Sequence, residues 1–312
     1  MVTMDDTPMT VTTTPSEVAM ATAPPPEDAV THPTRWESPD QSFAKYILEK
    51  GKGIETPNLG ATCVVQIIPL VSEGLEQGLV GYPMYEENEI TLGEGDTEIS
   101  AVLDACFETM QAAEVCEVEV AKETVGLGSG DDFLRFQLEL KDLTRKEDPW
   151  HQGSDEILSL ATHLKNKGTE CFKAAKIRPA IRRYSRALKL LVLLGKDIPE
   201  DQKAVYINLR VACYQNLAAC QIKLSQHDFV IKNCSKALLL DSGLVKALYR
   251  RGCSYTAVNE FEKARQDLQR ALEIEPANKA TIEQLKVLEK KSKAQDEKYA
   301  KAMAKMFGGP AK

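Results

Sequence analysis

The chain has 312 residues, of which 43% are hydrophobic, which is enough for two or three domains that each have a core. Its net charge of −7 is unevenly divided, because residues 1–150 hold 9 of the 39 Lys and Arg but 29 of the 46 Asp and Glu. The first half therefore has a net charge of −20 and the second half a net charge of +13. This asymmetry predicts either that the basic half binds an anionic partner or that the two halves attract each other.

The eight cysteines include no CxxC pair and no Cys/His ligand spacing, and most lie among apolar residues. They are interpreted as buried thiols of a reducing compartment. No apolar run approaches the roughly 18–20 residues that span a bilayer, and the N-terminus has no basic-then-apolar signal. We therefore expect no metal, no cofactor and no membrane segment, and a location in the cytoplasm or the nucleus.

Residues 1–35 are rich in Thr, Pro and Ala and are predicted to be disordered, because few large apolar groups offset the entropy of ordering. The patterns within residues 36–145 predict an α+β domain with one short helix at 99–110. Period-two alternation predicts half-buried strands at 115–120 and 133–140. The nearly continuous apolar run at 63–70 is either a strand buried on both faces or a short buried segment. Further strands are expected at 42–48 and 89–92.

Residues 51–70 read GKGxxxPxxGxxCVVxxxxL, a Leu-Gly pair follows at 92–93, and the domain closes on FQLEL at 136–140. These motifs resemble an FK506-binding-protein domain. The resemblance implies a prolyl cis/trans isomerase fold, in which a twisted antiparallel sheet wraps a short helix over an aromatic pocket.

The pocket positions of that family fall on residues that differ from the family pattern. Ile67 replaces a tyrosine and Leu103 replaces a tryptophan. The full set of matching positions is Ile67, Ile99, Ser100, Leu103 and Phe136. Isomerisation needs a desolvated apolar pocket to lower a barrier of about 18–20 kcal/mol. We therefore expect a degenerate isomerase domain and a protein that is not an enzyme.

After a linker at 146–154, small residues recur at a fixed interval. Ala218 and Gly252 are 34 apart, and so are Ala237 and Ala271. This period is typical of helix–turn–helix repeats that stack into an all-α solenoid. Gly168 fits the same scheme if the second helix of its repeat extends to about residue 194. The segments resemble the tetratricopeptide-repeat (TPR) domain of TPR-containing FK506-binding proteins, with repeats at about 155–196, 203–241 and 244–276 and a capping helix at 277–308.

Lys246 and Arg250 are four residues apart, so their side chains point the same way from one helix. TPR co-chaperones use a carboxylate clamp of lysines, asparagines and an arginine to hold an acidic C-terminal peptide. The resemblance implies that the clamp positions of this chain are Lys165, Thr169, Asn216, Lys246 and Arg250. Thr169 replaces an asparagine, so its hydroxyl offers one donor in place of an amide, and we expect reduced affinity.

The sequence thus predicts a non-catalytic co-chaperone adaptor. Its repeats would bind the acidic C-terminus of the 90-kDa heat-shock chaperone, with the 70-kDa chaperone as a competitor, and its acidic half would face clients such as steroid receptor complexes. Two alternatives are an active prolyl isomerase targeted by its repeats and a chaperone-independent scaffold. The basic helix at 286–307 also permits calmodulin binding. Nucleic-acid binding is not expected, because no recognised module is present.

Overall fold

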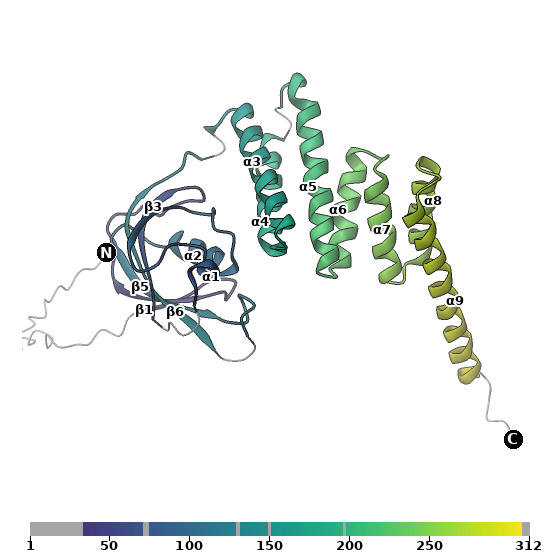
Figure 1. Ribbon diagram of the computed structural model, residues 1–312, viewed down its shortest axis with the longest axis horizontal. Helices are drawn as coiled ribbons and strands as arrows, with labels where there is room; N and C mark the ends of the chain where they lie inside the picture. The colour runs from purple at the N-terminus through teal and green to yellow at the C-terminus, as the bar shows by residue number, and fades with distance from the viewer. Residues whose placement is uncertain (1–33, 71–74, 129–131, 149–150, 196–197, 308–312) are drawn as a thin grey trace, which may run out of the picture. The chain divides into compact units, whose positions relative to one another are not determined.

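A computed structural model describes residues 34–70, 75–128, 132–148, 151–195 and 198–307. It confirms the predicted fold class, an α+β domain built on an antiparallel sheet followed by stacked helices (Figure 1). The predicted disorder of the tail concerns residues that lie outside the described ranges, except that Thr34 and Arg35 already belong to a strand. Among the described residues, no helix is both long and apolar enough to cross a membrane.

The described strands form one antiparallel sheet of six strands in the order β1-β2-β5-β6-β3-β4. Two short helices accompany the sheet, and Figure 1 shows α2 inside the curve of the strands. The elements are β1 (Thr34–Glu37), β2 (Ala44–Glu49), β3 (Thr62–Pro69), α1 (Gln77–Val80), β4 (Glu87–Thr91), α2 (Glu98–Phe107), β5 (Glu114–Ala121) and β6 (Phe133–Thr144). The sequence did not predict β1 and α1, because four residues are too few to show a period.

Strand β3 corrects one expectation about the apolar run at 63–70. Its side chains alternate between buried and partly exposed, so only one face of the strand is buried. Cys63, Val65 and Ile67 point into the core, while Val64 and Ile68 are partly exposed on the other face. An antiparallel sheet can leave one face toward solvent, and β-branched residues suit such a surface without full burial.

Helix α2 fills the sheet's concave face and begins with a capping box. The backbone N–H of Ser100 donates to Thr97 Oγ1 at 2.9 Å, and the N–H of Thr97 donates to Ser100 Oγ at 3.1 Å. Both bonds satisfy amide groups that a helix start leaves unpaired. Leu103 and Phe107 are completely buried against the strands. The start of α2 is therefore fixed by hydrogen bonds and its inner face by packing.

The rest of the described chain is helical, with paired helices that stack in sequence (Figure 1). The elements are α3 (Ser154–Lys173), α4 (Ile177–Leu194), η2 (Glu200–Gln202), α5 (Lys203–Lys223), α6 (His227–Leu240), α7 (Val245–Ala257), α8 (Phe261–Ile274) and α9 (Lys279–Phe307). Helix α4 ends at Leu194, which confirms the lengthened second helix of the first repeat.

The small residues that set the repeat lie where paired helices touch. A Cβ atom on Gly168 would come within 2.8 Å of the Tyr184 ring, and one on Gly252 within 2.8 Å of Leu268. In both pairs the larger residue follows 16 positions later. Interiors pack too tightly to absorb such overlaps, so the glycines allow each first helix to approach its second helix.

Helix α9 packs on the last repeat through its first half. Leu288 is completely buried beside Ala264 and Leu268 of α8. Further along, Tyr299, Met303 and Met306 are exposed. The helix therefore caps the solenoid with its N-terminal part, while calmodulin binding by its C-terminal part stays a prediction.

The turn inside each helix pair contains one residue in the left-handed region. These residues are Ala175 (φ 60°), Ser225 (φ 56°) and Asn259 (φ 64°), at the same intervals of 50 and 34 residues as the small residues. Asparagine tolerates this conformation, whereas an alanine Cβ clashes with the backbone at a cost of about 1–2 kcal/mol.

Replacing Ala175 with Gly should therefore stabilise the protein. We expect the free energy of unfolding to rise by about 0.5–1 kcal/mol. This is the strain energy that is relieved minus the larger conformational entropy that glycine loses on folding. Urea unfolding followed by circular dichroism measures the change. Ala174→Gly is the matched control, because Ala174 has φ −78° and should lose stability. A destabilised Ala175→Gly variant would contradict the strain argument.

Candidate functional site

The predicted clamp residues lie on the first helices of the three helix pairs. Helix α3 contacts α5, and α5 contacts α7, so these helices form one continuous face. Lys165 and Thr169 are on α3, Asn216 is in the middle of α5, and Lys246 and Arg250 are on the first two turns of α7. Lys246 is exposed and the other four side chains are partly buried.

Two cationic side chains act on helix α5 within one turn of Asn216. Arg250 Nη1 donates to the backbone carbonyl of Gln215 at 2.8 Å, which holds the guanidinium of α7 against α5 beside Asn216. Burial raises the pKa of the Cys213 thiol to about 12, and the positive charge of Lys165 opposes that rise. Lys165 therefore acts on α5 one turn before Asn216. The arrangement brings cationic groups from α3 and α7 toward one amide on α5.

Thr169 differs from the sequence-based expectation. Its Oγ1 donates to the carbonyl of Lys165 at 3.0 Å, and it shares a 3.1 Å hydrogen bond with the Tyr184 hydroxyl. The hydroxyl that the sequence offers as a donor to a peptide therefore already has two partners within the chain. The physical reason is the neighbouring Tyr184, which is only 2% exposed and needs a partner for its hydroxyl.

The predicted isomerase-pocket residues are in the core of the sheet domain. Ile67, Ser100, Leu103 and Phe136 are completely buried, and Ile99 is 1% exposed. Ser100 uses its side chain to cap α2. Within the described ranges, two cavities are lined in part by α2. Of the five predicted pocket residues, only Ile99 lines one of them.

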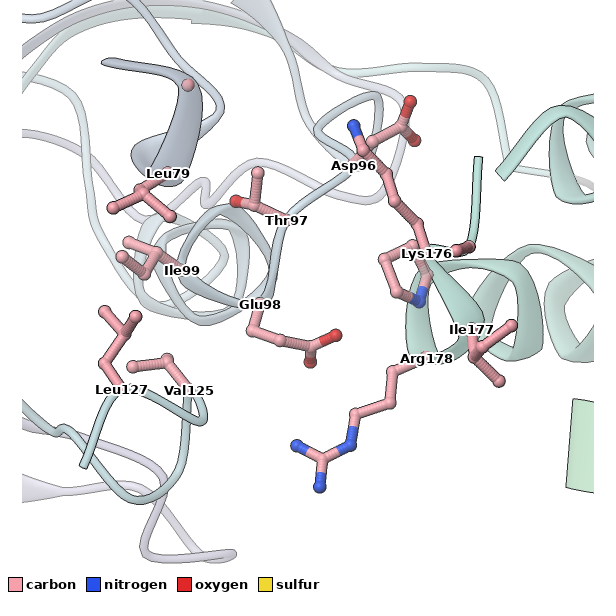
Figure 2. Close-up of a pocket in the computed structure, with 13 residues that line it drawn as sticks. Leu79, Asp96, Thr97, Glu98, Ile99, Val125, Leu127, Lys176, Ile177 and Arg178 are labelled. Carbon is pink, nitrogen blue, oxygen red and sulfur yellow. The ribbon is translucent and has the colours of Figure 1, made fainter. Parts of the chain in front are cut away.

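That cavity is a cleft of about 390 Å³ between α2 and the turn that joins α3 to α4 (Figure 2). Leu79, Ile99, Val125 and Leu127 line one side, and Lys176 and Arg178 are among the residues that line the other. Sequence reasoning missed this cleft, because its walls come from segments that are about 50–100 positions apart and neither wall has a motif of its own.

Three arginines of α4 hold the segment that leads into α2. Arg182 donates to the Thr97 carbonyl at 2.7 Å and pairs with Glu98 at 2.7 Å. Arg183 donates to the Glu94 carbonyl at 2.7 Å and pairs with Asp96 at 2.9 Å. Arg186 donates to the Gly93 carbonyl at 3.0 Å. These bonds agree with the alternative that the basic and acidic halves attract each other.

The carboxyl group of Asp96 is held in its ionised form by this contact. Burial alone would raise its pKa, but the hydrogen bonds from Arg183 and Cys171 and the charges of Arg183 and Lys176 outweigh burial and lower it. The Arg183 side chain is itself only 3% exposed. Breaking a buried pair from one side leaves an uncompensated charge, so this contact is costly to disrupt.

Asp104 of α2 supports the same segment from the inside. It accepts a 2.5 Å hydrogen bond from the Tyr82 hydroxyl and a 3.0 Å bond from the N–H of Gly93. Burial raises the pKa of its carboxyl to about 6, although both hydrogen bonds favour the ionised form. Both backbone groups of Gly93 are thus bound: its N–H donates to Asp104, and its carbonyl accepts from Arg186.

Asp104 should make stability depend on pH. In the unfolded chain its pKa returns to the ordinary value of 3.8, so between pH 4 and 6 the folded state keeps a proton that the unfolded state releases. The contribution of this group is complete below pH 4 and is lost as the pH rises toward 6. Raising the pKa of this carboxyl from 3.8 to about 6 corresponds to about 3 kcal/mol.

Asp104→Asn keeps the shape of the side chain but removes this titration. From pH 4 to pH 7, the unfolding free energy of the wild type should fall by about 3 kcal/mol relative to that of the variant. Urea unfolding at a series of pH values measures it. Curves that stay parallel over this range would show that Asp104 does not titrate there.

Comparison with known proteins identifies the family. Human FK506-binding protein-like is 32% identical over 277 residues, which are 88% of this chain and 72% of that protein. The chain belongs to the FK506-binding protein-like family. A family model for the tetratricopeptide repeat matches residues 245–278, which contain α7 and α8 of this family member.

A second relative corrects the expectation that the protein is not an enzyme. Bovine peptidyl-prolyl cis-trans isomerase FKBP4 is 32% identical over 282 residues, which are 87% of this chain and 59% of that protein. The name is that of an enzyme, so the comparison contradicts a prediction that was based on pocket substitutions alone. Most of these positions lie in the closed core, so a substitution at them does not by itself decide whether the domain is catalytic.

Solved TPR domains also match part of this chain. The first TPR domain of Spaghetti (RPAP3), bound to the HSP90 peptide SRMEEVD, is 26% identical to this chain with a TM-score of 0.35. The match covers 42% of this chain and 92% of that domain.

Proposed function

We propose that this family member is a co-chaperone whose helices α3, α5 and α7 bind the acidic C-terminus of the 90-kDa heat-shock chaperone. The observation that carries the proposal is the gathering of Lys165, Asn216 and Arg250 on the continuous face of these helices. Lys246 adds an exposed cation one turn before Arg250. A chain terminus that ends in Asp presents two carboxylates close together, and such a group needs several donors at once.

The chemistry of each side chain suits this role. Lysine supplies a compact charge, arginine a planar fork that can bind a carboxylate through two hydrogen bonds, and asparagine an amide that orients one oxygen. Arg250 is held by the Gln215 carbonyl, so less of its rotamer entropy is lost when a ligand binds. The proposed clamp is thus partly preorganised at its arginine.

Thr169 should weaken the clamp, because its hydroxyl is engaged by Lys165 and Tyr184. A peptide that displaces the bond to Tyr184 must leave the buried hydroxyl of that residue without a partner, at a cost of about 1–3 kcal/mol. The 70-kDa chaperone offers the same terminal carboxylates, and it is the competitor in this proposal. Discrimination between the two then rests on residues upstream of the terminal Asp.

Removing the arginine should abolish most of the binding. A charge-assisted hydrogen bond is worth about 1.5–3 kcal/mol, so Arg250→Ala should weaken an acidic C-terminal pentapeptide about tenfold or more. Lys246→Ala should have a smaller effect because Lys246 is exposed. Calorimetric titration of the full chain measures both variants.

Lys232→Ala is the matched control, because Lys232 is an exposed lysine of α6 and has no ion pair among the described residues. It should bind like the wild type. Unchanged affinity in both Arg250→Ala and Lys246→Ala, with circular dichroism showing intact helices, would reject the clamp.

The proposal extends to the role of the acidic half. The chaperone would be held by the helical repeats in the cytoplasm or nucleus, while the sheet domain faces a client such as a steroid receptor complex. Comparing the proteins that are retained by wild type and by Arg250→Ala separates chaperone-dependent partners from direct ones. Partners that are all kept by Arg250→Ala would favour a chaperone-independent scaffold.

Prolyl isomerisation is a second candidate, favoured by the enzyme name of a relative that matches 87% of this chain. The cleft beside Ile99 is where a peptide would reach this domain. Uncatalysed isomerisation takes tens to hundreds of seconds, so modest catalysis is measurable. We expect the full chain to accelerate isomerisation of a Leu-Pro peptide in a protease-coupled assay. A rate equal to that of the heat-unfolded protein would remove this candidate.

A further inference from the structure

The cleft between α2 and the α3–α4 turn has two chemically different walls (Figure 2). One wall combines aliphatic residues with Thr97 and Glu98, and two of the aliphatic residues, Leu79 and Leu127, are each 40% exposed. The opposite wall is the start of α4, with Ile177 between two cations. Figure 2 shows the guanidinium of Arg178 extending away from α4 into the open space between the walls.

The acidic groups of this cleft are already engaged. Asp96 pairs with Arg183 at 2.9 Å, and its pKa is also lowered by the nearby charge of Lys176. Glu98 pairs with Arg182 at 2.7 Å. Arg178 is exposed and forms no ion pair with any residue in the described ranges. The cleft therefore has excess positive charge on one wall and exposed aliphatic surface on the other.

We propose that this cleft binds an extended internal segment of a client protein in which an apolar side chain is followed by an acidic one. The apolar side chain would cover Leu79 and Leu127, and the carboxylate would pair with Arg178. A purely apolar ligand would leave the guanidinium without a partner, and a simple anion would leave the leucines in water. A volume of about 390 Å³ is within the range of clefts that hold small ligands, and so fits a few residues.

This site is separate from the proposed clamp. The clamp residues lie along α3, α5 and α7, whereas the cleft uses α1, α2, the segment after β5 and the start of α4. The clamp reads a terminal carboxylate, and the cleft reads a side-chain carboxylate within a chain. The binding inference also holds whether or not the cleft catalyses isomerisation.

The test uses two fluorescein-labelled hexapeptides with amidated C-termini, Gly-Gly-Leu-Glu-Gly-Gly and its twin with Gln in place of Glu. Amidation removes the terminal carboxylate that a clamp would need. Fluorescence anisotropy with the full chain at low salt should show that the Glu peptide binds about threefold to fivefold more tightly, the size expected of an exposed ion pair. The preference should disappear at 1 M salt. Equal binding of the two peptides by the wild type would overturn the proposal.

Variants then assign the preference to the cleft. Arg178→Gln should bind both peptides equally, while Arg270→Gln, which removes an exposed arginine from α8, should keep the preference. Leu127→Gln should weaken both peptides. A preference that survives in Arg178→Gln, or one that is lost in the clamp variant Arg250→Ala, would place the peptides elsewhere and overturn the proposal.

Discussion

Arg182, Arg183 and Arg186 donate hydrogen bonds to carbonyls and carboxylates between Gly93 and Glu98, and this contact joins the sheet domain to the first helix pair. Arg183 is buried, and Arg182 and Arg186 are partly buried. Removing the carboxylate that pairs with Arg183 would therefore leave a buried charge without its partner. The same segment ends at the capping box of α2 and is supported from within by Asp104. The contact therefore fixes the start of α2, one wall of the cleft and the position of α4 together.

The two proposed peptide sites share the first helix pair. The clamp uses α3 from one side, and the cleft uses the turn and the start of α4. Part of the positive charge of the second half binds the acidic segment through Arg182, Arg183 and Arg186. In the two proposals, Lys165, Lys246 and Arg250 would bind a chain terminus, and Arg178 would pair with a client carboxylate. Nucleic-acid binding is not needed to explain this charge.

Local patterns predicted the fold well because packing repeats with the sequence period. The glycines at 168 and 252 marked helix contacts, and the end of α4 followed from the spacing between repeats. Site details depended on contacts that no period records. The tie between Thr169 and Tyr184 spans 15 positions, and the contacts of Arg183 span almost 90. The net charge of each half indicated that such attraction exists but could not say which residues make it.

Tyr184 is held by two consecutive residues of α3, Gly168 and Thr169. Its ring lies in the notch that Gly168 leaves open, and its hydroxyl bonds to Thr169. A larger residue at 168 would need a smaller ring at 184. A smaller residue at 184 would leave a void and remove one of the two partners of the threonine hydroxyl. Changing Thr169 alone would instead deprive a buried phenol of its partner. Residues 168, 169 and 184 should therefore be replaced together more easily than one at a time. An asparagine at 169 would then cost least stability in a chain whose residue 184 has already changed.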